Sequence, residues 1–163
     1  MNICALKRKT PLRRTALPQR RRNKYNAQRV SAEENAVART MPELAGRSFA
    51  SGLELRRGIW LVCEQRAGRI SELVFQPQVH MTRARVGYKP DFRYEEAGRT
   101  IYEEVKGRET YPWITNRRLW RVYGPGVLRV VKAGRMGGCV VTETIVPHPT
   151  LAGGGGDDGG LEA

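Results

Sequence analysis

The segment from Tyr88 to Lys106 predicts a β-hairpin, and this hairpin constrains the fold more than any other feature of the chain. Two strand-like stretches flank a turn at Ala97-Gly98, and folding the chain back there places Asp91 opposite Glu104. Like charges that face each other destabilise a sheet, so the pair invites a compensating cation. Two convergent carboxylates with Lys106 close by are chemically suited to hold Mg²⁺ and to position a water.

Side chains alternate between the two faces of a strand, which sorts the second half of the hairpin. Tyr102, Glu104 and Lys106 are expected on one face, and Ile101 and Val105 on the other. The charged and the apolar side chains of this strand are therefore expected on opposite sides of the sheet.

Two helices are predicted on either side of the hairpin in sequence. Ser51-Gly52-Leu53-Glu54 has the spacing of a capping box, and the helix that it starts is expected to end at Gly68. The second helix is predicted from Trp113 to Tyr123, with its end at Gly124-Pro125. The apolar arc of the first helix is Leu55, Ile59, Trp60, Val62, Cys63 and Ala67, interrupted by Arg56 and Arg66, and the expected core aromatics of the second are Trp113, Trp120 and Tyr123.

Further strands are predicted at 70–80, where Pro77 indicates an edge or a bend, and at 127–131 and 138–146. Residues 31–46 are weakly patterned, with a short helix expected to end at Pro42. This order of elements predicts an α/β fold, with a small mixed β-sheet flanked by helices over residues 47–147.

The positive charge of the chain is concentrated at its N-terminal end. The whole sequence has 163 residues and a formal net charge of +13, and residues 1–30 contain ten Lys or Arg and no acid. Such an arm favours nucleic acid as the partner, with a solubilising tail or an anionic membrane surface as the alternatives. Pro11, Pro18 and the lack of an amphipathic face argue against the membrane. The candidate phosphate contacts in the arm are Arg13, Arg14, Arg20, Arg21, Arg22 and Lys24.

Both ends of the chain are expected to lack a core. Residues 1–30 predict a basic disordered arm, and residues 150–163, rich in Gly and Asp, predict a flexible tail. The three cysteines and two histidines have no zinc-binding spacing and indicate no disulfide framework, as is typical of a reducing compartment. No apolar run reaches the roughly 18 residues of a membrane span, so a cytoplasmic location is expected.

The hairpin also carries a resemblance to a known family. Pro90-Asp91, twelve intervening residues and Glu104-Val105-Lys106 resemble the motif of the PD-(D/E)XK nuclease superfamily. A phage-encoded subfamily of small endonuclease-like proteins, similar to Holliday-junction resolvases, has further elements that are similar to segments of this chain. These segments are Lys24-Tyr25-Asn26-Ala27, Phe49-Ala50-Ser51-Gly52-Leu53-Glu54-Leu55-Arg56-Arg57, Arg66-Ala67-Gly68-Arg69-Ile70 and Gln76-Pro77.

The resemblance implies a restriction-endonuclease-like core and a set of site residues. Glu54, Asp91 and Glu104 would bind Mg²⁺, with Mn²⁺ as a substitute and the Val105 carbonyl as a further ligand. Lys106 would orient or help to deprotonate the attacking water, or stabilise charge on the phosphate. Gln76 is a candidate lining residue.

The activity implied by the resemblance is metal-dependent cleavage of DNA, with branched or junction DNA as the expected substrate and a phage or prophage as the source. Such an enzyme would act in the cytoplasm of a bacterial host, and the resemblance admits a homodimer. The alternatives are a non-catalytic nucleic-acid-binding protein on a nuclease-like scaffold and an RNA- or ribosome-associated basic protein.

Each candidate residue also has a structural explanation. Glu54 suits a helix cap, Asp91 a loop, and Glu104 with Lys106 an ordinary surface ion pair. The arginines of the second predicted helix suit either phosphate contact or a solvated helix face; they are Arg117, Arg118 and Arg121.

Overall fold

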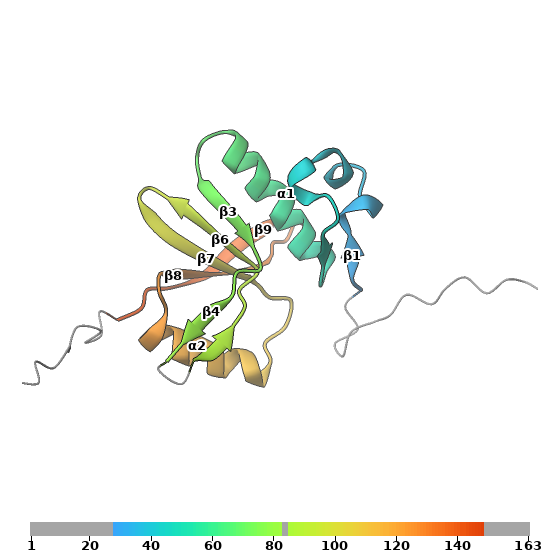
Figure 1. Cartoon of the computed structure of the whole chain (residues 1–163). Coiled ribbons are helices and arrows are strands. Elements are labelled where there is room, and N and C mark those ends of the chain that lie inside the picture. The colour runs from blue at the N-terminus through green and yellow to red at the C-terminus, as the bar shows by residue number, and fades with distance from the viewer. Residues whose placement is uncertain (1–27, 83–84, 149–163) are drawn as a thin grey trace, which may run out of the picture.

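A mixed five-stranded sheet forms the centre of the molecule in the computed structural model, which describes residues 28–82 and 85–148 (Figure 1). Neighbouring strands are antiparallel except for the central pair, β7 and β8, which is parallel. This confirms the predicted α/β fold with a small mixed sheet. The strands lie in the order β3 (Ser71–Phe75), β6 (Phe92–Glu96), β7 (Arg99–Val105), β8 (Val127–Ala133) and β9 (Cys139–Ile145).

The hairpin of β6 and β7 has the predicted register. Phe92 pairs with Glu103, and the ladder continues without a shift to the pair of Glu96 and Arg99. Ala97 and Gly98 turn the chain with φ values of 49° and 72°, because a two-residue hairpin turn of the favoured type requires positive φ at both positions. Asp91 therefore precedes the ladder beside Glu104, as predicted.

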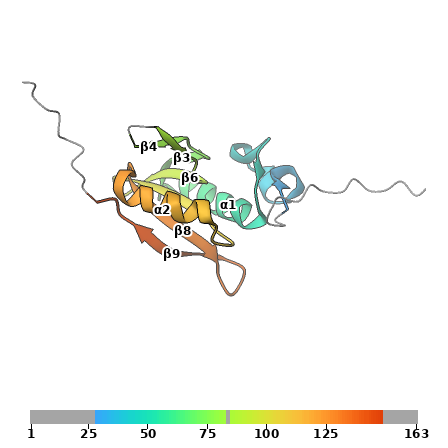
Figure 2. The ribbon, with the colours of Figure 1, turned by 90° about the horizontal axis from the view of Figure 1, so that it is seen from below.

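Two helices cover opposite faces of this sheet (Figures 1 and 2). The helix α1 (Gly52–Arg66) packs into one hydrophobic core with Ile101 of β7, and α2 (Tyr111–Tyr123) into a second core with Tyr102. The alternation along β7 thus divides its side chains between the two cores, as the sequence predicts.

The helix α1 begins as predicted but buries a different face. The Ser51 hydroxyl accepts a hydrogen bond from the Glu54 N–H at 3.2 Å, which confirms the cap. Trp60 and Cys63 were expected in the apolar arc, yet both are exposed, while Leu61 and Arg57 are buried. The prediction failed because Arg57 pairs with a buried acidic residue on the sheet. The side of α1 that carries Arg57 therefore faces the sheet.

That partner is Glu103, whose side chain is fully buried. Arg57 donates two hydrogen bonds to the Glu103 carboxylate, at 2.7 and 2.5 Å, and Tyr94 donates a third at 2.6 Å. Arg129 in turn donates to the Tyr94 hydroxyl at 3.0 Å and pairs with Glu96. The core of α1 therefore contains a hydrogen-bonded ion pair that ties the helix to the middle of the sheet.

The core extends N-terminal of residue 47, where the predicted domain begins. The strands β1 (Val30–Ser31) and β2 (Ser48–Phe49) pair with each other. Residues 31–46 form three 3₁₀ helices, not one short helix, and Pro42 begins the third because its fixed φ suits a first helical position. These helices are η1 (Ala32–Glu34), η2 (Ala38–Thr40) and η3 (Pro42–Leu44), and they add Ala32, Ala38 and Leu44 to the hydrophobic core that contains α1.

The predicted strand at 70–80 is two strands in different sheets. The chain bends at Gln76-Pro77, between β3 and β4 (Val79–Met81), which confirms the bend indicated by Pro77. The strand β4 then pairs with β5 (Val86–Tyr88) in a small sheet that the sequence did not predict, and this sheet lies beside α2 (Figure 1).

The helix α2 ends at Gly124, as predicted. Trp113 and Trp120 are buried as expected, and the Trp120 indole N–H donates to the Gly126 carbonyl at 2.9 Å. Tyr123 was expected in the core but is 49% exposed, because it lies on the outer side of the last turn.

Several expectations fall on residues outside the described part of the chain. They are the basic disordered arm with its candidate phosphate contacts, up to residue 27, and the Gly-rich tail from residue 149. Within residues 28–82 and 85–148, no helix has the length and apolar character needed to cross a membrane.

We predict that Glu103→Ala lowers the free energy of unfolding by about 3–5 kcal/mol, because it leaves the Arg57 charge buried without a partner. Denaturant unfolding at pH 7 measures this change. Glu43→Ala is the matched control, since it removes a carboxylate that pairs with Arg66 at the surface, and it should cost no more than about 1 kcal/mol. Equal losses in the two variants would show that the buried pair has no special role.

Candidate active site

Two acidic side chains meet where the β6–β7 hairpin opens. The Asp91 N–H donates to the Glu103 carbonyl at 3.0 Å, which extends the ladder by one step, and the Asp91 carboxylate accepts from the Val105 N–H at 2.7 Å. Glu104, which lies opposite, is 5% exposed. The hairpin register therefore holds two carboxylates side by side at the end of the sheet.

Lys106 is the basic member of this cluster. Its ammonium forms an ion pair with one Glu104 oxygen and lies 5.1 Å from the centre of the Trp113 ring. The other Glu104 oxygen accepts a hydrogen bond from the Tyr88 hydroxyl at 2.6 Å. Glu104 is thus oriented by two donors, and Lys106 is held over an aromatic face that is favourable for a cation.

Glu54 reaches the cluster from the first turn of α1. Its carboxylate accepts from the Ala50 N–H at 2.6 Å and from the Gln76 amide at 3.3 Å, and the side chain is almost fully buried. Burial raises the pKa of Glu54 above its usual value, and the Glu104 charge raises it further, although the Ala50 and Gln76 donors oppose the shift. Glu54 is therefore more than a helix cap.

Gln76 links Glu54 to Asp91. The Gln76 N–H donates to the Asp91 carbonyl at 2.8 Å, while its side chain donates to Glu54. Gln76 also has a φ of 50°, in the left-handed region that non-glycine residues seldom adopt. Strained positions of this kind are enriched at functional sites, and here the strained backbone places the amide between two acidic residues.

Asp91 carries the strongest sign of charge crowding. Burial raises its pKa well above the usual value of 3.8, and the nearby Glu104 and Glu54 carboxylates raise it further. The hydrogen bond from Val105 and the charge of Lys106 act in the opposite direction but do not cancel the shift. The ionised form of Asp91 is therefore disfavoured in this cluster, first by burial and then by its acidic neighbours, and a bound cation would favour it.

The candidate metal ligands fit Mg²⁺ in their chemistry. Within the described part of the chain, no three His, Cys, Asp or Glu side chains lie close enough to form a complete metal cage. Mg²⁺ is usually held by one or two carboxylates together with water and substrate phosphate, and Asp91 and Glu104 match that pattern. The expected set of three carboxylate ligands, Glu54 with Asp91 and Glu104, is therefore not assembled among the described residues. Glu54 interacts electrostatically with the other two and is suited to hold a bound water.

The structure brings together six of the predicted site residues. Glu54, Gln76, Asp91, Glu104, Val105 and Lys106 are linked by the contacts described above. On α2, Arg117 and Arg121 pair with Glu143 of β9 at 3.1 and 3.2 Å, whereas Arg118 is exposed. Two of these three arginines therefore have a protein partner.

Sequence reasoning missed the residues that support the site. Tyr88 and Trp113 orient Glu104 and Lys106, and the Arg57–Glu103 pair fixes α1 against β7. The acidic pair Glu103-Glu104 carried a signal, because adjacent strand residues face opposite sides and one of the two must face the α1 core. Arg57, the partner of Glu103, lies 46 residues away in the sequence, and no sequence pattern indicated that the two residues would pair.

Comparisons with protein-family models, with curated proteins and with solved structures found no match to this chain. The function must therefore be argued from the site. Its parts are buried carboxylates with oxygen donors for a hard cation, one ammonium and a glutamine amide, and this combination suits the stabilisation of charge on a phosphate during hydrolysis.

We predict that Asp91→Asn stabilises the metal-free protein at pH 7, because it removes a charge that burial and, to a smaller extent, the Glu104 and Glu54 carboxylates disfavour. A raised folded-state pKa means that stability falls as the pH rises from about 3.8 toward that higher value. The gain in melting temperature should therefore shrink on acidification to pH 4. Melting curves in EDTA measure this, with Glu95→Gln at the far end of β6 as the control. A lower melting temperature for Asp91→Asn at pH 7 would contradict charge crowding.

Proposed function

We propose that this chain is a Mg²⁺-dependent DNA endonuclease with a restriction-endonuclease-like core, of the PD-(D/E)XK type. The observation that carries the proposal is the pairing of Asp91 with Glu104 at the open end of a hairpin, with Lys106 two residues further on. The motif residues are 13 positions apart in the sequence, and only the register of this hairpin makes them neighbours.

Charge crowding supports a site for a cation. Carboxylates that repel one another are costly to bury, and the pKa of Asp91 is raised by burial and by its acidic neighbours. A bound Mg²⁺ would offset this repulsion, generate a nucleophilic water and neutralise charge on the scissile phosphate. Mn²⁺ would serve in its place.

The roles of the protein side chains follow from their surroundings. Asp91 and Glu104 would hold the cation, and Glu54 would orient a water within reach of the Gln76 amide. Lys106, released from Glu104 as the positive charge of the cation replaces it, would face the phosphate. In the hydrolysis the water oxygen would bond to phosphorus and one P–O ester bond would break. The proton of the water would pass to bulk solvent, and the departing oxygen would take a proton from solvent. The Lys106 ammonium stabilises the negative charge that develops on the phosphate oxygens.

Charge favours a nucleic-acid substrate. The chain has a net charge of +13, and residues 1–30 alone contribute ten basic residues without an acid. Such a distribution attracts a phosphate backbone. The resemblance of the motif indicates that this nucleic acid is DNA, with branched or junction DNA as the preferred substrate. It also indicates that the enzyme acts in the cytoplasm of a bacterial host. It also admits a homodimer.

A second candidate function is nucleic-acid binding without cleavage. The ion pair between Lys106 and Glu104, together with the lack of a complete acidic cage among residues 28–82 and 85–148, favours this alternative. Metal dependence separates the two functions, because only an enzyme requires the cation for turnover.

The decisive experiment is cleavage of a four-way DNA junction and of plasmid DNA, with Mg²⁺ or with EDTA. We predict Mg²⁺-dependent cleavage that Asp91→Ala and Glu104→Ala each abolish, while both variants still bind DNA in Ca²⁺. Each loses a cation ligand without changing the basic arm. Glu95→Ala, at the other end of β6, should cleave like the wild type. Cleavage by Glu104→Ala at the wild-type rate would refute the proposed site.

Lys106→Ala separates an enzyme from a binding protein. If Lys106 only pairs with Glu104, the change should alter little, since partly exposed ion pairs contribute about 0–1 kcal/mol. We predict instead that single-turnover cleavage falls on the order of a hundredfold with metal affinity nearly unchanged. Lys106→Arg should not restore the rate, because a planar guanidinium does not replace a compact ammonium. A thermal melt controls for unfolding, and near-normal cleavage by the alanine variant would favour the second candidate.

A further inference from the structure

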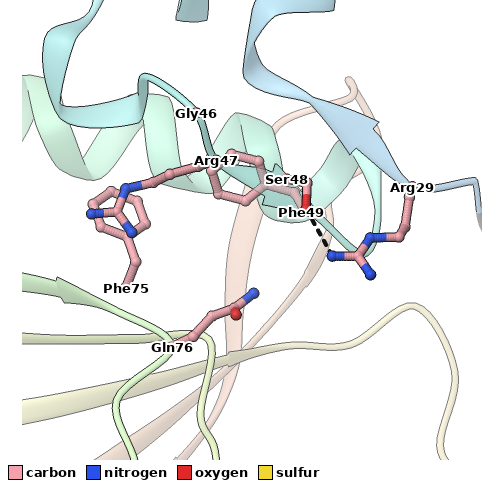
Figure 3. A pocket seen from close by; sticks show the side chains of 7 residues that line it. All are labelled: Arg29, Gly46, Arg47, Ser48, Phe49, Phe75 and Gln76. Atoms are coloured by element: carbon pink, nitrogen blue, oxygen red, sulfur yellow. Dashed lines mark hydrogen bonds between the residues drawn. The ribbon is translucent and has the colours of Figure 1, made fainter.

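A pocket of about 240 Å³ lies next to the candidate active site, between the β1–β2 pair and the end of β3 (Figure 3). The Arg29 guanidinium and the Gln76 amide reach toward the space beneath Phe49 from opposite sides in this view. The lining residues are Arg29, Gly46, Arg47, Ser48, Phe49, Phe75 and Gln76.

The polar side chains of this pocket are suited to an anion. Arg29 and Arg47 bring two positive charges, and no acidic side chain is among the lining residues. Arg29 donates to the Ser48 hydroxyl at 2.7 Å, so the hydroxyl keeps its own proton for another acceptor. The nearby carboxylate of Glu33 is already bound to the Gly46 N–H at 2.7 Å.

The side-chain conformation of Arg47 is fixed by contacts with the protein. Its guanidinium stacks on the Phe75 ring, 4.3 Å from the centre, and its Nε donates to the Glu43 carbonyl at 2.8 Å. These contacts fix the stem and the plane of the side chain, while the two terminal nitrogens remain as donors with the fork geometry that matches a phosphate. A prearranged guanidinium loses less entropy on binding.

Gln76 connects the pocket to the candidate active site. It lines the pocket, and it also donates to Glu54 and to the Asp91 carbonyl. An anion in the pocket would therefore be separated from the carboxylates by Gln76. The sequence before Arg29 contributes nine further basic residues and no acidic ones, so the pocket lies where the most basic segment of the chain joins the fold.

We infer that the pocket holds a backbone phosphate of the DNA strand, next to the phosphate at the carboxylates. The identity of the ligand as DNA rests on the proposed function, whereas the preference for an anion rests on the pocket itself. Arg29 and Ser48 would bind the phosphate directly, and Arg47, whose guanidinium lies over Phe75 on the opposite side of the pocket in Figure 3, would attract it by its charge. Gln76 would separate the phosphate from the site of cleavage. The pocket would thus fix the register of the strand relative to Lys106.

The test is the salt dependence of binding. The full chain is titrated with a fluorescent 16-nucleotide single-stranded DNA in EDTA at several salt concentrations. Each phosphate contact on a single strand contributes about 0.7 to the slope of log K against log salt. Arg29→Ala/Arg47→Ala should reduce the slope by about 0.7 and weaken binding about tenfold. Arg29→Lys/Arg47→Lys, which keeps both charges, should retain most of the slope.

The matched control is Arg69→Ala/Arg99→Ala, which removes two exposed charges. Arg69 precedes β3 and Arg99 begins β7, so neither lies at the end of β3 that borders the pocket. It should keep the wild-type slope. Melting curves check folding, and if the loss of the Arg47 stack on Phe75 unfolds the protein, Arg29→Ala alone is tested. A wild-type slope and affinity in the pocket variant would overturn the inference.

Failure of this inference is distinguishable from failure of the proposed function. Binding of the single strand is measured without metal, and cleavage of the four-way junction and of plasmid DNA with Mg²⁺ is measured separately. A reduced slope with no wild-type cleavage would support the pocket and refute the nuclease. Wild-type cleavage with an unchanged slope in the pocket variant would refute the pocket and support the nuclease.

Discussion

The buried ion pair between Arg57 and Glu103 is the interaction on which the geometry of the site depends. Arg57 lies one helical turn after Glu54 on α1, and Glu103 directly precedes Glu104 on β7. A buried pair of this kind adds little net stability compared with apolar side chains, but it is costly to break and it specifies one arrangement. With Tyr94 as a third partner, it fixes the distance and rotation between the helix and the strand that carry two candidate ligands.

The two faces of β7 have separate roles as a result. Glu103 points into the α1 core, where its carboxylate binds Arg57, and Glu104 points toward Tyr88 and Lys106 at the candidate site. A one-residue slip of β7 would exchange these side chains and leave an unpaired carboxylate in the core. The stability of the ion pair therefore also protects the register that brings Asp91 and Glu104 together.

The sequence predicted those parts of the fold that local rules determine. The hairpin register followed from one turn at Ala97-Gly98, and the start of α1 from the Ser51 cap. Contacts between distant segments were not predictable in the same way. Trp60 was assigned to the core because it is apolar, but Arg57 took the buried position because Glu103 lies opposite it. The β4–β5 pair was missed because three-residue strands carry too little pattern to be recognised.

Within the candidate site, the motif residues were predictable and their support was not. Asp91, Glu104 and Lys106 are close in sequence. Gln76 was a candidate only through the family resemblance, because no residue pattern reveals the backbone angle through which it reaches the site. This strained position has a physical implication for function. The Asp91 charge is costly in the metal-free fold and Gln76 holds an unusual backbone angle, although both residues also form hydrogen bonds that support the fold. A protein that only binds nucleic acid has no need of either cost. The crowded carboxylates, the strained glutamine and the adjoining basic pocket together favour our proposal of a catalytic site. In that site a cation would neutralise the carboxylates, and a phosphate would bind to the arginine side chains of the pocket.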